Sequence, residues 1–139
     1  MIAIDTNILI RYITQDDELQ SKAVERLLAK YGGETQSIFI NNIVLCELVW
    51  VLDRGYKYSK EQITSTMRII FSTTEFAFEH HNILWLTLED YEHNKADFAD
   101  CLISQLNQHF KQSHLHRYSV FSKFDIDFWL KKSKLLLSF

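Results

Sequence analysis

The chain alternates short apolar runs with longer segments in which apolar residues recur every three or four positions. Short runs of this kind are typical of buried strands in a parallel sheet, and the longer segments are typical of helices that bury one face. The predicted strands are residues 1–5, 37–41, 76–80, 116–121 and 134–139. The predicted helices are residues 6–14, about 16 to 31, 43–54, 63–71, 81–94, 97–110 and 125–132.

Strands and helices alternate along the whole sequence, without a repeat, a linker or a low-complexity tract. This order predicts an α/β fold with a mainly parallel sheet of four or five strands. A chain of 139 residues is long enough for one domain with a substantial core, and a second domain does not fit comfortably. We therefore expect a single domain over residues 1–139.

The composition excludes several kinds of binding site. Hydrophobic residues make up 47% of the chain, which is typical of a domain with a real core. Only three Gly and no Pro occur, so we expect neither a glycine-rich dinucleotide loop nor a phosphate-binding P-loop. The formal net charge of -3 supplies no global basic field, so a nucleic-acid substrate requires a local patch of cations.

Two observations indicate the compartment. Cys46 and Cys101 are far apart in apolar contexts, as is typical of reduced core cysteines in a cytosolic protein. The apolar N-terminal run reaches Asp5 after four residues and lacks a basic leader, unlike a signal peptide or a membrane span. We therefore expect a cytoplasmic protein with no membrane partner.

One carboxylate stands out because of its surroundings. Glu47 is the only charged residue between Ile43 and Leu52, in a segment that is apolar almost all round. A helix buried on all sides would remove this carboxylate from water, which costs several kcal/mol unless a cation or hydrogen-bond donors compensate. The alternative is that Glu47 faces a solvent-filled groove.

Other acids lie at the ends of predicted strands or at the start of a helix. Asp5 and Asp125 follow strands, and Asp97 and Asp100 begin a helix with the i, i+3 spacing that places both on one face. Helix N-caps are the alternative role for Asp5 and Asp97. In a parallel sheet these acids and Glu47 would meet at one edge, where a cluster of carboxylates requires cations. Oxygen ligands without His or Cys favour Mg²⁺ or Mn²⁺.

Four segments together resemble the motifs of PIN-domain nucleases and, more narrowly, of the VapC-type toxins of type II toxin–antitoxin pairs. They are DTNILIRYIT at 5–14, LCELVWVL at 45–52, ADFADCLIS at 96–104 and FDIDF at 124–128. The resemblance spans nearly the whole chain with the motifs in order. It implies a PIN-like three-layer α/β/α sandwich and a Mg²⁺- or Mn²⁺-dependent endoribonuclease, a phosphodiester hydrolase acting on RNA.

The resemblance also implies roles for individual residues. The implied catalytic and metal-binding acids are Asp5, Glu47, Asp100 and the more variable Asp125, with Asp97 as an auxiliary acid. The DTN signature implies that Thr6 and Asn7 support these acids. One departure is Lys123, where the family commonly has Thr or Ser two positions before its fourth Asp. This departure bears on the geometry around Asp125.

An acidic pocket repels RNA, so its rim must supply cations. The candidates for substrate binding are Arg11, Arg54 and Lys57, with Lys60 close to the last two in sequence. Aromatic residues near them, which can stack on unpaired bases, are Tyr12, Trp50 and Tyr56. The alternative for each cation is an ordinary solvated surface charge.

The resemblance implies partners and leaves alternatives. VapC-type toxins form homodimers and bind the helical tail of a cognate VapB-like antitoxin, and cutting RNA would inhibit translation or growth. One alternative is a PIN nuclease that processes RNA without an antitoxin. A second is a catalytically silent RNA- or protein-binding module, of which Lys123 would be the sign.

Overall fold

The computed structural model describes residues 1–114. The chain divides into two compact units, Met1–Gln105 and Leu106–Phe139, and most described residues belong to the first. The strands predicted at 116–121 and 134–139, and the helix predicted at 125–132, lie outside the described residues. The prediction of one domain over the whole chain stays a prediction.

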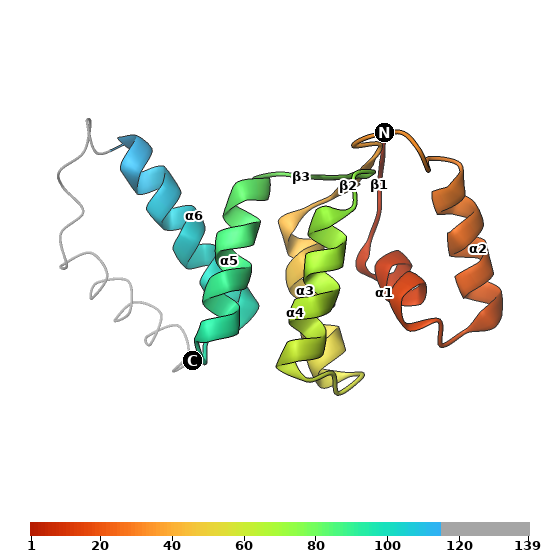
Figure 1. Ribbon diagram of the computed structural model, residues 1–139, viewed down its shortest axis with the longest axis horizontal. Helices are drawn as coiled ribbons and strands as arrows, with labels where there is room; N and C mark the ends of the chain where they lie inside the picture. The colour runs from red at the N-terminus through yellow and green to blue at the C-terminus, as the bar shows by residue number, and fades with distance from the viewer. Residues whose placement is uncertain (115–139) are drawn as a thin grey trace, which may run out of the picture. The chain divides into compact units, whose positions relative to one another are not determined.

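Three short parallel strands form the sheet among the described residues (Figure 1). They are β1 (Ile2–Ala3), β2 (Ile38–Ile40) and β3 (Phe76–Phe78), in the order β1-β2-β3. Ile38 at the centre pairs with Ile2 on one side and Phe76 on the other. Each strand lies inside a predicted run and is shorter than it. The parallel pairing confirms an α/β fold, because parallel neighbours need long crossovers, which the helices provide here.

Six helices are present in the part of the chain that the structure describes. They are α1 (Thr6–Thr14), α2 (Glu18–Ala29), α3 (Asn42–Arg54), α4 (Lys60–Ser72), α5 (His81–His93) and α6 (Phe98–His114). Every helix predicted within these residues is found, and α1 has the predicted bounds. The predicted capping box is confirmed at α4, where Ser59 and Gln62 bond each other's backbone N–H groups. The side chains of Asp5, Asp17 and Asn41 cap α1, α2 and α3.

The core is built around one face of α3. Its Leu45, Leu48 and Leu52 are completely buried. Leu9 of α1 and Met67 of α4 are equally buried. Fully burying a side chain of this size contributes about 1.5–3 kcal/mol, so this apolar layer is the main source of the stability of the unit.

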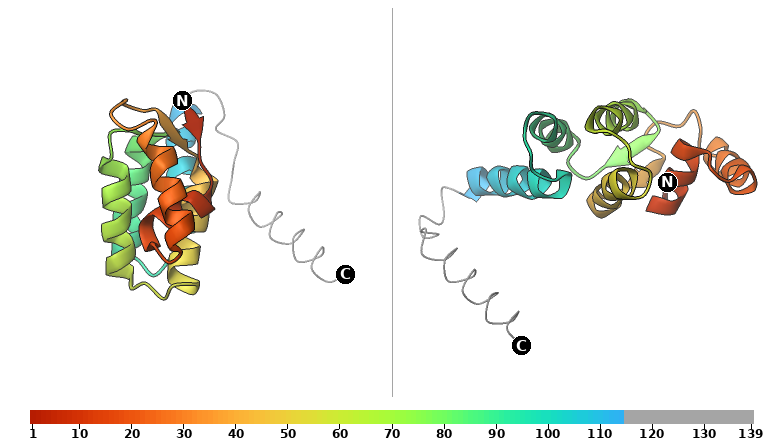
Figure 2. Two further views of the ribbon diagram at one scale, coloured as in Figure 1. Left: turned by 90° about the vertical axis from the view of Figure 1, so that its right-hand side faces the viewer. Right: turned by 90° about the horizontal axis from the view of Figure 1, so that it is seen from below.

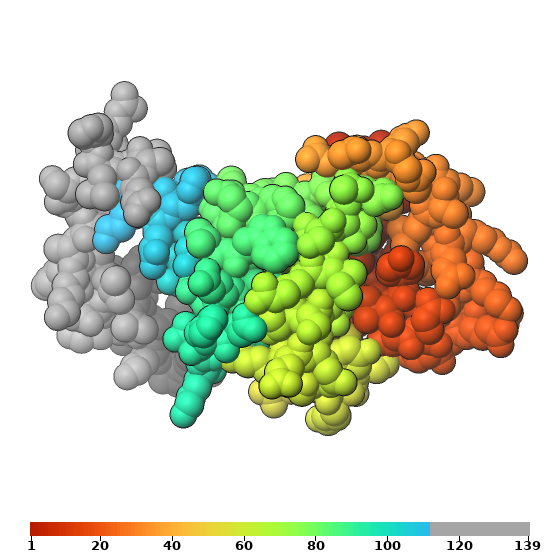
Figure 3. Space-filling view, viewed as in Figure 1, coloured from red at the N-terminus to blue at the C-terminus, as the bar shows by residue number. Residues whose placement is uncertain are grey.

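Neighbouring helices pack in a consistent order. Helix α3 contacts α1 and α4, α1 also contacts α2, and α4 contacts α5. The views in Figures 1 and 2 agree on these neighbours, and Figure 3 shows the side chains of α4 and α5 meeting over the front of the molecule. An ion pair between Arg68 and Glu92, at 2.6 Å, also joins α4 to α5. The contact of α1 with α3 brings together the two helices that carry the first two motifs.

Two sequence predictions concern the cysteines and membrane spans. Cys46 is half-buried and Cys101 is buried, and both are free thiols, as predicted. Burial raises the pKa of each thiol. Among the described residues, no helix combines the length and the apolar character needed to cross a membrane.

Candidate active site

Asp5 lies between β1 and α1 and caps the helix. Its Oδ1 accepts a hydrogen bond from the backbone N–H of Ile8 at 3.0 Å. The residue is exposed. The helix-cap role considered from the sequence is therefore confirmed. It is compatible with ligand binding, since the cap uses only one of the two carboxylate oxygens.

Glu47 is exposed, which corrects the expectation of a buried carboxylate. Helix α3 buries one face only. Leu48 next to Glu47 is completely buried, whereas Ile43 and Trp50 are exposed together with Glu47. Apolar residues therefore occupy both the core face and part of the solvent face of α3. The carboxylate avoids the cost of burial and is accessible to a ligand.

The hydroxyl of Thr6 connects the start of α1 to Glu47. Its Oγ1 donates a hydrogen bond to Oε2 of Glu47 at 2.5 Å, and Thr6 itself is buried. Hydrogen bonds to a charged acceptor are shorter and stronger than neutral ones. Because Thr6 directly follows Asp5, this bond holds the Asp5 end of α1 beside Glu47. The following residue, Asn7, is exposed.

Asp97 and Asp100 are both exposed at the start of α6. Helix α6 begins directly after Asp97, and the backbone N–H of Cys101 bonds to the Asp97 carbonyl at 3.0 Å. Asp100 borders a hollow of about 380 Å³ at the surface. The hollow is also lined by Asp90, Asn94, Lys95, Ala96, Cys101 and Ser104. This end of α6 is thus a polar, accessible surface.

The predicted convergence of all the acids is not found within residues 1–114. No three Asp, Glu, His or Cys side chains in this range lie close enough together to hold a metal ion. The structure joins Asp5 with Glu47 through Thr6, and places Asp97 directly before α6 and Asp100 in the first turn of that helix. Asp125 lies outside the described residues. The donors are exposed carboxylates, which are the ligands that Mg²⁺ and Mn²⁺ prefer, so the chemistry of the donor set fits these ions.

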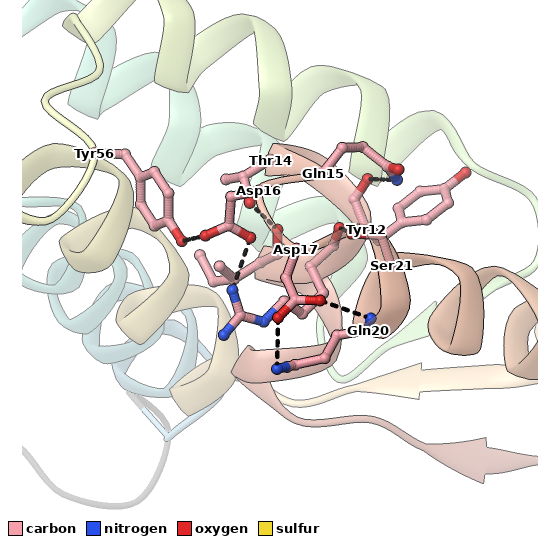
Figure 4. Close-up of polar contacts among 10 residues, drawn as sticks. Tyr12, Thr14, Gln15, Asp16, Asp17, Gln20, Ser21 and Tyr56 are labelled. Atoms are coloured by element: carbon pink, nitrogen blue, oxygen red, sulfur yellow. Dashed lines mark hydrogen bonds and ion pairs between the residues drawn. The ribbon is translucent and has the colours of Figure 1, made fainter.

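Arg11, a predicted substrate contact, forms an ion pair with Asp16. Arg11 Nη1 lies 2.7 Å from Asp16 Oδ1, and the Tyr56 hydroxyl donates to Asp16 Oδ2 at 2.6 Å (Figure 4). These two bonds, the one from Tyr56 first, lower the pKa of Asp16 to about 2, and the bond to Asp16 raises the pKa of Tyr56. We call Arg11, Asp16 and Tyr56 the loop latch, because it ties the α1–α2 loop to the α3–α4 loop.

The other predicted cations differ in how they are engaged. Arg54 makes a long, exposed pair with Asp53 through Nε, at 3.4 Å. Lys57 is exposed and has a left-handed backbone conformation with φ of 58°. Lys60 donates to the backbone carbonyl of Asn94 and lies 4.5 Å from the centre of the Tyr91 ring. Arg54 and Lys57 are therefore the more available of the three.

Sequence reasoning did not identify the loop latch or the hollow beside Asp100. Asp16 and Tyr56 are 40 residues apart, and no local pattern relates them. The hollow likewise includes Asp90, which comes from α5 and accepts a hydrogen bond from Gln105 of α6 at 2.5 Å. The sequence signals are Asp16 and Tyr56 in separate loops for the latch and Asp90 in α5 for the hollow, and none of these signals identifies a partner.

Comparisons with known proteins bear on this arrangement. The sequence profile described as the PIN domain matches residues 2–128. A protein named VapC ribonuclease from Aquifex aeolicus (strain VF5) is 25% identical over 104 residues, which cover 75% of this chain and 76% of that protein. No solved structure matches the chain. Because the profile covers most of the sequence, including every predicted acid, the chain belongs to the PIN-domain family.

Proposed function

We propose that this protein is a metal-dependent endoribonuclease that hydrolyses RNA phosphodiester bonds, and that it is the toxin of a toxin–antitoxin pair. The observation that carries the proposal is the hydrogen bond from Thr6 to Glu47, which brings the first two acidic motifs together. The name of the similar Aquifex protein, VapC ribonuclease, supports the same activity. The exposure of Asp5, Glu47 and Asp100 supports it further, because the carboxylates of a nuclease must be accessible to a polymeric substrate.

In this proposal Mg²⁺ or Mn²⁺ is held by Asp5, Glu47, Asp100 and Asp125. When bound, such an ion lowers the pKa of a water molecule and neutralises phosphate charge. The protein's own part is to orient the carboxylates. Thr6 fixes Oε2 of Glu47, and the cap at Ile8 fixes Oδ1 of Asp5.

The auxiliary residues act around these acids. Asp97, which directly precedes α6 and lies three residues before Asp100, takes the attacking water's proton or orients that water, unless Glu47 does so. Asn7 supports the acids from the exposed start of α1. Arg54 and Lys57 bind the flanking phosphates of the RNA, and Arg11 does so only where phosphate replaces Asp16 as its partner.

The complete fold is part of the same proposal. The family match runs from residue 2 to residue 128, through both compact units. We therefore propose one PIN-like domain over residues 1–139, a three-layer α/β/α sandwich whose sheet has four or five strands. In that fold Asp125 joins the other acids.

The proposed partners are a second copy of the chain and a VapB-like antitoxin. The surface is hollowed between α2 and the end of α4 (Figure 3), where a cleft of about 300 Å³ has an apolar floor that includes Leu28, Ile38 and Phe76. Glu25 and Glu75 also line it, which suits a helix carrying both apolar and basic residues. On the outside of the molecule, Ile69 is 70% exposed and is a candidate for the homodimer contact.

The experiment is cleavage of a mixed pool of structured RNAs by the purified full-length chain with Mg²⁺ or Mn²⁺. EDTA and the Asp100→Asn variant are the controls. Cutting that requires metal and disappears in the variant supports the nuclease and assigns Asp100 to its site. If well-folded protein neither cuts RNA nor binds metal, the silent binding module replaces this proposal.

The toxin role needs a separate test, because a processing nuclease would also cut RNA. Expression of the intact chain and of Asp100→Asn in bacteria is compared, with and without co-expression of any small DNA-binding protein that a neighbouring gene encodes. A toxin arrests growth only as the intact chain, and the neighbour relieves the arrest. Unimpaired growth with active enzyme would favour RNA processing without an antitoxin.

A further inference from the structure

Three candidate site residues form one stripe along the exposed face of α3. Glu47, Trp50 and Arg54 follow one another at intervals of three and four residues, so they lie on the same side of the helix. The three residues are exposed, and Trp50 as a whole is 65% exposed. We call these three residues the α3 stripe.

The exposure of Trp50 has no explanation in the packing of the first unit. The opposite face of α3 supplies the core, with five buried residues. Within residues 1–114 no aromatic ring packs against Trp50, whereas Trp85 of α5 contacts Phe71 and His81. A side chain this large and this accessible is typical of a surface that binds something.

The structure also separates Trp50 from the other aromatic candidates for base stacking. Tyr56 belongs to the loop latch, where its hydroxyl is bonded to Asp16. Tyr12 lines the cleft that contains Glu25 and Glu75, whose negative charges oppose an RNA backbone. Trp50 is the candidate whose neighbours along the helix are the proposed metal ligand on one side and a cation on the other.

The order of the groups along the stripe suits a single-stranded polynucleotide. Trp50 lies about 4.5 Å along the helix axis from Glu47, and Arg54 lies about 6 Å further on. The pair of Arg54 with Asp53 is exposed and 3.4 Å long, so a phosphate can compete for the guanidinium. The stripe thus presents a carboxylate, an aromatic ring and a cation in sequence. Along an RNA strand these groups would face the scissile phosphate, a base and the next phosphate.

We propose that Trp50 stacks on an unpaired base of the RNA beside the cleaved bond, and that Arg54 contacts the adjoining phosphate. This inference rests on the proposed nuclease function and adds a determinant of substrate choice to it. Stacking tolerates any base but requires that the base be unpaired, so the stripe selects single-stranded segments and loops over duplex.

The test measures RNA binding through Trp50 itself. Trp85→Phe and Trp129→Phe in the full-length chain leave Trp50 as the sole tryptophan, and Asp100→Asn prevents cleavage. We expect an unstructured oligouridylate to quench its fluorescence to saturation, and a blunt-ended RNA duplex without unpaired bases to quench it less. Binding of the oligonucleotide without a change in Trp50 emission would overturn the proposal.

Substitutions at Trp50 supply the second readout. Labelled oligouridylate should bind Trp50→Ala about 10- to 100-fold more weakly than the parent, and Trp50→Tyr should recover most of the affinity. Leu19→Ala, at another highly exposed apolar residue, is the matched control and should bind as the parent does. Equal affinity of Trp50→Ala and the parent would also overturn the proposal.

The outcomes distinguish this inference from the function on which it rests. If the parent cuts RNA in a metal-dependent way but Trp50→Ala binds and cuts as the parent does, only the stacking role fails. If the intact chain neither binds nor cuts RNA, the nuclease function fails with it. If Trp50 emission shifts with protein concentration alone, and Trp50→Ala abolishes self-association, the stripe is a contact between copies and the proposal is wrong.

Discussion

The buried hydroxyl of Thr6 donates a 2.5 Å hydrogen bond to Oε2 of the exposed Glu47, across 41 residues of sequence. This bond couples the residue after Asp5 to the acid of the second motif. It restricts the rotation of a long side chain on the helix surface, which would otherwise sample many rotamers. A carboxylate that is oriented before a ligand arrives binds that ligand at a lower entropic cost.

Removing the Thr6 hydroxyl should therefore weaken both metal binding and RNA cleavage. Thr6→Val is expected to lower metal affinity or kcat/KM about 10- to 100-fold, because the support of a metal ligand is lost. Thr6→Ser, which keeps the hydroxyl, should retain most of the activity. Mn²⁺ titration and initial cleavage rates measure the two effects, and circular dichroism checks the fold. Equal activity of the Val and Ser variants would show that the hydrogen bond has no functional role.

The two faces of α3 should respond differently to truncation. Leu48 is completely buried, so Leu48→Ala should destabilise the protein by about 2–5 kcal/mol. Trp50→Ala on the exposed face should change the free energy of unfolding by less than about 0.5 kcal/mol. Urea unfolding followed by far-ultraviolet circular dichroism measures both. If Trp50→Ala lowered the free energy of unfolding as much as Leu48→Ala does, the exposed face of α3 would be covered in the folded protein.

Much of the local structure is predictable from the sequence, and the reason is visible at the helix ends. Helix α1 begins at Thr6, after the Asp5 cap, and the Ser59 and Gln62 pattern correctly marks the start of α4. Caps are local: they depend on residues three positions apart, so a single sequence contains all of the relevant information. The family motifs likewise identify Asp5 and Glu47 as candidate site residues from the sequence alone.

What the sequence does not predict depends on tertiary packing. Glu47 is predicted to be buried, because α3 is apolar almost all round, yet the side that faces the core is decided by α1 and α4. Asp16 and Tyr56 meet only because two separate loops fold to the same end of the unit. Arg11 illustrates the consequence: the sequence predicts a free cation for RNA, and the structure engages it in an ion pair.

The loop latch makes stability depend on pH in the acid range. The folded-state pKa of Asp16 is about 2, below its ordinary value of 3.8, so its contribution is present above pH 3.8 and is lost as pH falls towards 2. Between about pH 4 and pH 2, the free energy of unfolding of the intact chain should therefore fall by more than that of an Asp16→Asn variant. Urea unfolding of both proteins at pH 5 and pH 2.5 measures the difference. Parallel losses in the two proteins would exclude a contribution from the latch.

The contribution of the α4 capping box to stability should be measurable with a single substitution. Ser59→Ala removes the side chain that accepts from the Gln62 N–H and should cost about 1 kcal/mol. Ser65→Ala is the matched control, since Ser65 is exposed in the interior of the same helix, where Ala is the better helix former. Thermal and urea unfolding compare the two. If both variants have unchanged stability, the capping box does not stabilise the native state.

The most direct test of the central claim is Mn²⁺ binding to the full-length chain by titration calorimetry. Asp5→Asn, Glu47→Gln and Asp100→Asn are compared with Glu61→Gln, a control at an exposed carboxylate in the first turn of α4. If the acids of separate motifs form one metal site, the intact protein binds Mn²⁺ saturably. Each of the three site variants then binds at least about tenfold more weakly, and Glu61→Gln binds as the intact protein does. Unchanged Mn²⁺ affinity in all three site variants would contradict a shared metal site.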